Sequence, residues 1–324
     1  MTAEPGTRVL KADHDGIAAA ARCLTAGGLV AFPTETVYGL GADAANGEAV
    51  ARVYAAKGRP AFNPLIAHVA DAAAARRLAV FDPAAEALAT AFWPGPLTLV
   101  LPKRPDCPVS DLALAGLDSI ALRVPDHPVA HALLEAFGGP VVAPSANRSG
   151  HVSPTTAAHV LSDLRGRIDL VIDGGAADVG VESTIVSCLG EPTLLRPGGL
   201  PRAEIERMLG RSLAMAAVPS DDEAPLAPGM LSSHYAPKAR LRLDADHIEP
   251  GEALLAFGPA PAHTGAMLNL SSTGDLIEAA ANLFSHLRAL DASGAKNIAV
   301  MTIPHEGLGE AINDRLARAA APRP

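Results

Sequence analysis

The stretch from residue 28 to residue 68 concentrates side chains that could bind an anion. An apolar run at 28–32 gives way at Pro33 to a polar segment with hydroxyls, one carboxylate and two glycines. Lys57 and Arg59 follow a helix-like segment, two residues apart. A lysine supplies a point charge and an arginine a planar fork, so the pair suits a polyphosphate. Two cations after a helix also commonly do no more than decorate its C-terminus.

The segment 33–41 is interpreted as a loop that leads from a buried strand toward a helix. Its hydroxyls, Thr34 among them, could hold a small polar ligand, and Glu35 could orient them or receive a cation. Gly39 and Gly41 would permit backbone turns that other residues avoid. An ordinary connection with capping hydroxyls explains the segment equally well.

Arg123 stands inside the apolar run Ala121-Leu122-Arg123-Val124-Pro125. A buried arginine must be paired, so it meets either an internal Asp or Glu or the carboxylate of a ligand. Because a guanidinium binds a carboxylate with two parallel hydrogen bonds, Arg123 is predicted to hold an amino-acid carboxylate.

Three further polar segments lie beside apolar runs. Ser145, Asn147 and Ser149 follow a strand-like run at 140–143 and could donate hydrogen bonds to phosphate or ribose. Glu182-Ser183-Thr184 opens one run, and Arg196 closes another. Six such segments in one α/β region predict a shared cleft, because strand ends in these sheets place ligand sites together.

Several other signals carry no chemistry. No Walker sequence occurs, and the Gly39–Ala44 stretch fails the dinucleotide fingerprint at its third glycine. His127 and His131 have helical spacing without the metalloprotease glutamate, so no protein-held metal is predicted. Ser145 lacks a nucleophile-elbow context, which argues against an acyl-enzyme.

The elements that must position these residues alternate in type. Strands are predicted at 28–32, 97–101, 119–124, 140–143, 169–172, 184–188 and 193–195. Helices are predicted at 15–26, 46–56, 71–78, 83–92, 127–137, 154–163 and 201–209. The alternation is typical of an α/β fold, and the short strands favour a mixed sheet.

The chain is divided into a first domain at 1–210, a linker at 211–238 and a second domain at 239–324. Four prolines and an acidic run give the linker its irregular character. Its distal part, 228–237, is distinctive enough to suggest a functional lid. The second domain is predicted to have strands at 253–257 and 297–303 and helices at 275–290 and 309–320.

Composition limits the class of protein. The 324 residues are 49% hydrophobic and 19% charged, with a net charge of -9. An acidic chain without a basic tail is a poor candidate for tight nonspecific nucleic-acid binding. Three isolated cysteines form no disulfide framework, and no apolar stretch has the length of a membrane span. The chain is predicted to be cytoplasmic and not to associate with membranes.

These motifs, in this order, resemble the YrdC-like family of L-threonylcarbamoyladenylate synthases over nearly the whole chain. The segments that carry the resemblance in the first domain are Pro33-Thr34-Glu35-Thr36-Val37-Tyr38-Gly39-Leu40, Lys57-x-Arg59-Pro60, Asn63-Pro64-Leu65, Pro94-Gly95-Pro96-Leu97-Thr98, Leu122-Arg123-Val124-Pro125, Pro144-Ser145-Ala146-Asn147 and Glu182-Ser183-Thr184. Those that resemble the long, two-domain form are Ser233-His234-Tyr235-Ala236-Pro237, Gly307-Leu308-Gly309 and Ala311-Ile312-Asn313-Asp314-Arg315.

The resemblance implies a YrdC-like domain with an open, twisted, largely mixed sheet flanked by helices. It also implies a smaller Rossmann-like α/β/α C-terminal domain. The implied reaction joins L-threonine, bicarbonate and ATP into threonylcarbamoyl-AMP with release of pyrophosphate. A separate tRNA threonylcarbamoyl transferase complex would then modify a tRNA adenosine next to the anticodon, and weak contact with tRNA is conceivable. Mg²⁺ is expected as cofactor, bound through phosphates and water.

The resemblance also implies roles for individual residues. Threonine or its carbamate is assigned to Thr34, His68, Arg123 and Thr184. The nucleotide is assigned to Lys57, Arg59, Asn63, Ser145, Asn147, Ser149 and Arg196. The residues expected to act in catalysis are Lys57, Arg59 and Arg123, and the lid is assigned to His234 and Tyr235. Two alternatives stay open: an RNA-binding protein and a carbamoyl-transfer protein that uses a related domain. Oligomeric state and the role of the second domain are left open.

Overall fold

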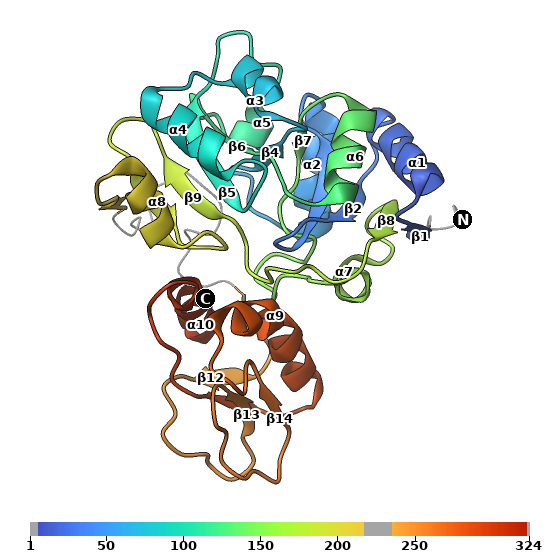
Figure 1. The fold of residues 1–324 in the computed structure, drawn as a ribbon. Coiled ribbons are helices and arrows are strands. Elements are labelled where there is room, and N and C mark those ends of the chain that lie inside the picture. The colour runs from blue at the N-terminus through green and yellow to red at the C-terminus, as the bar shows by residue number, and fades with distance from the viewer. Residues whose placement is uncertain (1–5, 217–234, 323–324) are drawn as a thin grey trace.

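A mixed sheet of eleven strands forms the centre of the larger domain (Figure 1). The computed structural model describes residues 6–216 and 235–322. The strands run across the sheet in the order β1-β8-β2-β3-β7-β4-β6-β5-β9-β10-β11. Their bounds are β1 (Arg8–Lys11), β2 (Val30–Pro33), β3 (Tyr38–Asp43), β4 (Ile66–His68), β5 (Leu97–Pro102), β6 (Ser119–Arg123), β7 (Val141–Val142), β8 (Leu170–Asp173), β9 (Thr184–Ser187), β10 (Thr193–Arg196) and β11 (Ala214–Met215).

Eight described helices accompany this sheet. They are α1 (His14–Thr25), α2 (Gly47–Lys57), α3 (Ala72–Leu78), α4 (Pro83–Phe92), α5 (Asp111–Leu114), α6 (Pro128–Phe137), α7 (Ala157–Leu164) and α8 (Arg202–Leu209). Helices α1 and α6 pack on one face, and the other six contribute to the core on the opposite face. Strand alternation explains the split: Val30 and Phe32 face the first pair, whereas Leu29 and Ala31 face the larger core.

Local sequence explains where the helices begin and end. Asp13, Asp71, Asp82 and other N-cap residues accept hydrogen bonds from backbone N–H groups in the first turn. Helix α2 begins after Asn46 and ends at Gly58, whose φ of 60° is in the left-handed region. This C-cap turns the chain so that residues on either side of Gly58 point into the domain.

The small domain has a parallel four-stranded sheet in the order β12-β15-β13-β14. Its elements are β12 (Arg240–Arg242), β13 (Ala253–Ala256), β14 (Met267–Asn269), α9 (Leu276–Ala292), β15 (Asn297–Val300) and α10 (Gly309–Ala320). Both helices pack on the face that carries Leu255 and Ile298, and loops with Ile248 cover the opposite face around Leu254. The α/β class expected from the sequence is confirmed, with both described helices of the small domain on one face.

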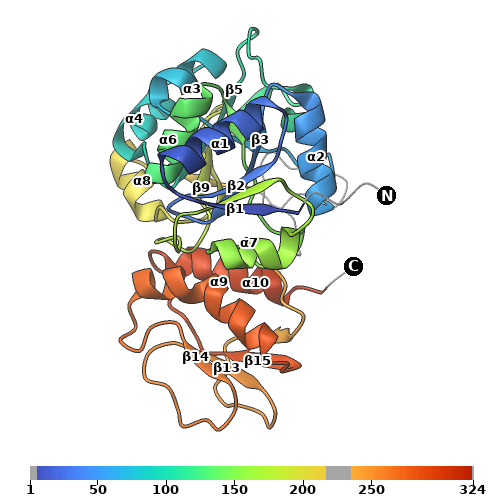
Figure 2. The same cartoon turned by 90° about the vertical axis from the view of Figure 1, so that its right-hand side faces the viewer.

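Helices α9 and α10 lie between the small sheet and the larger domain, as both views show (Figures 1 and 2). Val37, Val152 and Val181 of the large domain belong to the same buried cluster as Phe284 and Ile312 of these helices. The two domains therefore share a continuous apolar core. None of the helices in the described ranges has the length and apolar character needed to span a bilayer.

The structure corrects several expectations. Strands β1, β3, β4, β12 and β14 and helix α5 were not predicted, and β11 adds an edge strand within the segment expected to be irregular. Most are four residues or shorter, too short to show a period in sequence. Strand β3 has six residues, but Gly39 and Gly41 interrupt the sequence of apolar side chains that would indicate a strand.

Candidate functional site

The segment 33–41 is a β-hairpin and not the strand-to-helix loop expected from its composition. β2 and β3 pair antiparallel around the turn at 34–37. Gly39 and Gly41 adopt no left-handed conformation and serve close packing instead: a Cβ on Gly41 would lie 2.8 Å from the ring of Phe32, and one on Gly39 would lie 3.1 Å from the Cβ of Ala143. The hairpin can therefore sit tightly beside the segment that follows β7.

His68 and Arg123 are neighbours on one face of the sheet. β4 and β6 are parallel, with His68 opposite Arg123 and Ile66 opposite Ala121. Because Ala67 and Leu122 face the larger core, His68 and Arg123 point to the other side. Both are buried, with exposed fractions of 3% and 4%. Desolvation and the adjacent Arg123 charge lower the pKa of His68 to about 3, so its imidazole is neutral.

The partner of Arg123 is Glu35, from the hairpin turn. A guanidinium nitrogen of Arg123 lies 2.6 Å from Oε1 of Glu35, and its Nε donates to the Gly95 carbonyl at 3.4 Å. The contact with Glu35 lacks the alignment of a hydrogen bond: both carboxylate oxygens and that nitrogen have no hydrogen-bond partner among the described residues. The sequence left two possible partners for Arg123, an internal carboxylate or a ligand carboxylate, and the structure shows the internal one. One terminal nitrogen of Arg123 still has no hydrogen-bond acceptor among the described residues.

Lys57 and Arg59 also turn inward rather than decorating a helix end. Nζ of Lys57 donates to the carbonyls of Ser145 at 2.5 Å and Asn147 at 2.6 Å. Arg59 donates to the carbonyl of Pro64 at 3.1 Å. Burial, with the Arg59 charge second, lowers the pKa of Lys57 well below its ordinary value. Burial also lowers the pKa of Arg59 to about 10, which leaves it positively charged near neutral pH.

Another part of the wall is formed by Glu182, Ser183 and Arg196. A terminal nitrogen of Arg196 donates to the Ser183 carbonyl at 2.9 Å, and the Ser183 hydroxyl bonds that of Thr98 at 2.8 Å. Glu182 accepts from the Ser153 hydroxyl at 2.5 Å. Burial alone would raise the pKa of Glu182, but the charges of Arg315 and Arg196 lower it to about 2.

These segments enclose one small cavity of about 50 Å³. Its lining residues are Val37, Arg59, Ile66, His68, Arg123, Ala143, Pro144, Ser145, Glu182, Ser183, Arg196 and Tyr235. Tyr235, from the linker, is 1% exposed and fills one side. The remaining volume is much smaller than the few hundred Å³ of a typical ligand pocket. Three guanidinium groups around a neutral imidazole suit carboxylate and phosphate ligands.

The structure brings together six of the residues predicted for the site: Arg59, His68, Arg123, Ser145, Arg196 and Tyr235. Thr34 and Thr184 lie nearby, but their hydroxyls donate to the carbonyls of Val37 at 2.7 Å and Leu200 at 2.6 Å. The sequence placed the segment Glu182-Ser183-Thr184 in the shared cleft but gave no role to Glu182 or Ser183, and both residues line the cavity. His234 and the rest of 217–234 lie outside the described residues.

Three further predicted residues, Asn63, Asn147 and Ser149, do not line the cavity. Asn63 and Asn147 are buried, and the side-chain oxygen of each has no hydrogen-bond partner among the described residues. Ser149 donates its backbone N–H to the Lys57 carbonyl at 2.8 Å. Ser149 also lines a hollow of about 1150 Å³ between the two domains, which shares no lining residue with the cavity.

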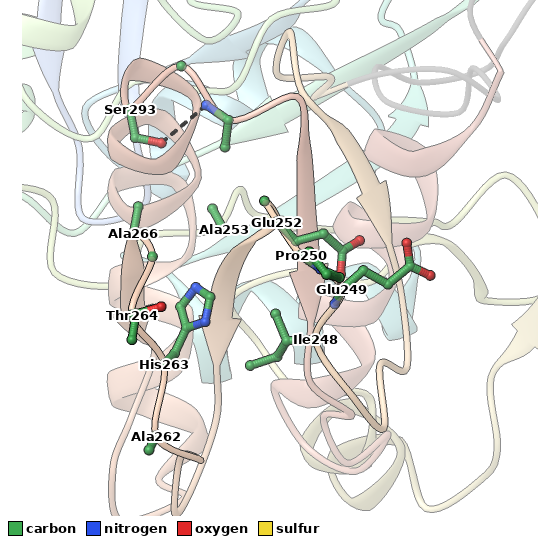
Figure 3. A pocket seen from close by; sticks show the side chains of 14 residues that line it. Ile248, Glu249, Pro250, Glu252, Ala253, Ala262, His263, Thr264, Ala266 and Ser293 are labelled. Atoms are coloured by element: carbon green, nitrogen blue, oxygen red, sulfur yellow. Dashed lines mark hydrogen bonds between the residues drawn. The ribbon is translucent and has the colours of Figure 1, made fainter.

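A separate hollow of about 650 Å³ lies in the small domain (Figure 3). It is bordered by loops that precede β13, β14 and β15, whereas open parallel sheets bind ligands at the carboxyl ends of their strands. Glu252 there pairs with Arg242 at 2.5 Å, and Figure 3 shows its carboxylate pointing away from His263. The larger volume contains none of the predicted site residues, so we assign the site to the smaller, cationic cavity.

The fold and the cavity define a class: a two-domain α/β protein with a buried cationic cleft for small anionic molecules. Residues 22–198 match the family model of Sua5, YciO and YrdC, described as "Telomere recombination". Residues 200–321 match a model described as "Threonylcarbamoyl-AMP synthase, C-terminal domain".

Full-length relatives agree with both matches. The chain is 41% identical to the threonylcarbamoyl-AMP synthase of Bacillus subtilis, over 98% of this chain and 96% of the relative. It is 44% identical to that of Pyrococcus abyssi, over 94% of each chain. The crystal structure of P. abyssi Sua5 complexed with L-threonine superposes with a TM-score of 0.89 at 40% identity, covering 97% and 98% of the two chains. The chain belongs to the threonylcarbamoyl-AMP synthase family, in its two-domain form.

Proposed function

We propose that this protein catalyses the synthesis of threonylcarbamoyl-AMP and pyrophosphate from L-threonine, bicarbonate and ATP. One observation carries the proposal: three buried guanidinium groups and a neutral imidazole converge from separate strands and loops on a single cavity. Such a cavity can bind a carboxylate and a phosphate chain side by side. Membership of the family supplies the reaction that uses both.

Arg123 binds the threonine carboxylate in this proposal. Its terminal nitrogen, which has no aligned acceptor among the described residues, is available for a second, bidentate partner. His68 lies beside it as a neutral ring whose Nδ1 has no partner in the part of the chain that the structure describes, so it can exchange a hydrogen bond with the threonine amine or carbamate. Thr34 and Thr184 belong to this half through the family resemblance.

The nucleotide occupies the other half. Arg59 and Arg196 contact the phosphates, and Lys57 holds the loop that begins at Ser145 through two carbonyls. Asn147 and Ser149 belong to the same loop, and the Asn63 carbonyl accepts from Nε of Arg59, so we assign all three to the nucleotide. The orphaned amide oxygens of the two asparagines support this assignment, because buried polar atoms without partners are rare in proteins.

The reaction then proceeds without a covalent enzyme intermediate. The threonine amine attacks bicarbonate, which forms the N–C bond of the carbamate and releases water. A carbamate oxygen attacks the α-phosphorus of ATP, and the bond to the bridging oxygen breaks as pyrophosphate leaves. Arg123 fixes the amino acid, Arg59 and Arg196 stabilise charge on the phosphates, and orientation of the two reactants supplies much of the rate.

Mg²⁺ is proposed to enter with the nucleotide. Among the described residues, no group of three His, Cys, Asp or Glu side chains is arranged to hold a metal. The donor set around the cavity is cationic and fits the phosphate chain, so phosphate oxygens and water would ligate the ion. Bound there, Mg²⁺ would neutralise part of the triphosphate charge.

Tyr235 closes the cavity in this proposal. Its ring stacks on Phe284 at a centroid distance of 5.6 Å, and it borders the same space as Arg123 and Arg196. A cavity of about 50 Å³ cannot hold both substrates, so in this proposal Tyr235 shifts to admit them and returns to exclude water from the carbamate. The lid segment as hypothesised, 228–237, lies mostly outside the described residues.

We further propose that the product passes to a tRNA threonylcarbamoyl transferase complex in the cytoplasm. Mixed phosphoric–carbamic anhydrides are reactive acyl donors, so a transferase that accepts the group must act soon after release. Any contact with tRNA would be transient, in keeping with the net charge of -9.

The test is pyrophosphate release from ATP with threonine and bicarbonate each present or omitted. We expect release to require all three substrates, with serine as a matched amino acid that differs by one methyl group. A carbamoyl-transfer protein would instead use carbamoyl phosphate, and an RNA-binding protein would release no pyrophosphate. Absence of threonine-dependent release would contradict the proposal.

A further inference from the structure

Arg315, on α10 of the small domain, reaches into the larger domain and has no exposed surface. Its Nε donates to Oε2 of Glu182 at 2.7 Å, and a terminal nitrogen donates to the carbonyl of Pro197 at 3.0 Å. Its other terminal nitrogen pairs with Asp314 at 2.5 Å. The guanidinium lies 5.2 Å from the ring centroid of Tyr235. One side chain of the small domain thus holds a carboxylate, a carbonyl and an aromatic ring at the cleft.

Glu182 is fixed from two sides. Oε2 receives Arg315, and Oε1 accepts from the Ser153 hydroxyl. The charges of Arg315 and Arg196 overcome the effect of burial and keep the Glu182 carboxylate ionised. Its backbone carbonyl accepts from the Gly199 N–H at 2.9 Å, and Gly198 packs so closely that a Cβ there would lie 2.3 Å from this carbonyl. Glu182 cannot move independently of its neighbours.

Residues 179–184, here called the cleft strip, connect Glu182 and its partner Arg315 to both halves of the site. At one end, Val179 donates its N–H to the carbonyl of Glu35, the partner of Arg123, at 2.8 Å. At the other end, the Ser183 carbonyl accepts from Arg196. In between, Gly180 touches α9, where a Cβ would lie 2.3 Å from the Ala280 carbonyl. A displacement of the strip would alter both arginines.

We propose that Arg315 is a positioning residue for the reaction proposed above, which fixes the cleft strip from the small domain through Glu182. Arg315 touches no substrate itself. The inference gives the small domain a role in the cleft, and it accounts for the segment 311–315, which carries part of the family resemblance yet lies outside the catalytic domain.

A matched control exists in the same interface. Arg202 of α8 pairs with Glu310 on the first turn of α10, and neither residue lines the cavity. Loss of that pair weakens contact between the domains without releasing the cleft strip. Glu310→Gln therefore separates a general loosening of the interface from the specific effect of Arg315.

The first measurement is steady-state pyrophosphate release. Arg315→Met is expected to lower kcat about 100-fold, the cost of misaligned reactants, while Glu310→Gln stays within about twofold of the parent protein. Arg315→Lys keeps the charge without the planar fork and should recover about tenfold of the loss. In a Glu182→Gln background, the further loss from Arg315→Met should shrink to about threefold, because both changes release the same strip.

The second measurement needs neither substrate nor activity. Amide hydrogen exchange should accelerate at least tenfold across residues 179–184 in Arg315→Met and in Arg315→Lys, and not in Glu310→Gln. If Arg315→Met does not fold, Arg315→Lys carries the same comparison.

Unchanged exchange in the strip would overturn the inference whatever the activities are, and so would fully additive losses in the double variant. A parent protein without threonine-dependent pyrophosphate release would instead overturn the proposed function. The exchange measurement would still decide whether Arg315 holds the strip.

Discussion

Two buried arginine–carboxylate pairs belong to the cleft, and they differ in what surrounds them. Arg123 and Glu35 approach to 2.6 Å, and Arg315 and Glu182 approach to 2.7 Å. Both oxygens of Glu182 accept hydrogen bonds, whereas neither oxygen of Glu35 has one among the described residues. Distance alone would treat the two pairs as equivalent.

We infer from this difference that the pair of Arg123 and Glu35 is the one available to a ligand, whereas the pair of Arg315 and Glu182 stabilises the fold. An ion pair in a low-dielectric interior is favourable only when its remaining donors and acceptors are satisfied. The pair of Arg315 and Glu182 meets this condition and joins two domains. The pair of Arg123 and Glu35 does not, so it gains most from a ligand that supplies the missing partner.

Removing Arg123 should produce the largest effect. Arg123→Ala is expected to lower kcat/KM for threonine about 1000-fold, equivalent to about 4 kcal/mol, because a buried charge-assisted contact is lost. The KM for ATP should change less than about threefold. Pyrophosphate release at saturating ATP and varied threonine measures the first value, and the converse titration measures the second.

Lys57→Ala should affect ATP more than threonine in the same assay. Lys57 holds two carbonyls of the loop at 145–147, so its loss should raise the KM for ATP about tenfold and leave that for threonine nearly unchanged. Equal effects of both substitutions on both substrates would mean that the cleft is not divided as proposed.

Sequence predicted the framework well and the internal contacts of the site poorly. Helices with clear caps, such as α4 with Asp82 before Pro83, were placed correctly because their signals are local. Strand β3 was missed because its glycines serve packing against Phe32 and Ala143, which lie outside its own segment. A strand whose pattern depends on its neighbours shows no period of its own.

The candidate site shows the same limit. Arg123 could be recognised as needing a partner, yet only the fold shows that Glu35 approaches it. Thr34 and Thr184 are assigned to threonine through the family resemblance, and only the fold shows that both hydroxyls donate to backbone carbonyls. Arg315 and Glu182 are 133 residues apart in sequence, and no local pattern connects an arginine of one domain to a carboxylate of the other.

A fall in pH should weaken the pair of Arg315 and Glu182, in which both carboxylate oxygens accept hydrogen bonds. The pKa of Glu182 is about 2 in the folded protein and 4.5 ordinarily, so its stabilising effect is present above pH 4.5 and is lost as pH falls toward 2. Between pH 5 and pH 3 the parent should lose about 2 kcal/mol of unfolding free energy that Glu182→Gln does not lose. Denaturant titrations at both pH values give this difference.

The exposed pair of Arg76 and Glu86 is the control for that experiment. Its atoms approach to 2.6 Å, but both side chains are about two-fifths exposed, so solvent screens the charges. Glu86→Gln should follow the parent within about 0.5 kcal/mol at both pH values. An equal loss of unfolding free energy from both pairs would show that burial and complete hydrogen bonding do not make the pair of Arg315 and Glu182 more stabilising than an exposed pair.

The last expected effect concerns Tyr235, whose ring lies on Arg315 and borders the same cavity as Arg123. Tyr235→Ala should consume about ten ATP for each threonylcarbamoyl-AMP that accumulates, because water reaches the product in the open cavity and hydrolyses it to threonine, bicarbonate and AMP. Tyr235→Phe keeps the ring and should remain within about twofold of the parent. Product per pyrophosphate, measured by chromatography, gives the ratio. If Tyr235→Ala still forms one threonylcarbamoyl-AMP per ATP, the ring packs on Arg315 without shielding the cavity from water. Tyr235 would then belong to the pair of Arg315 and Glu182 and would have no effect on the side of Arg123.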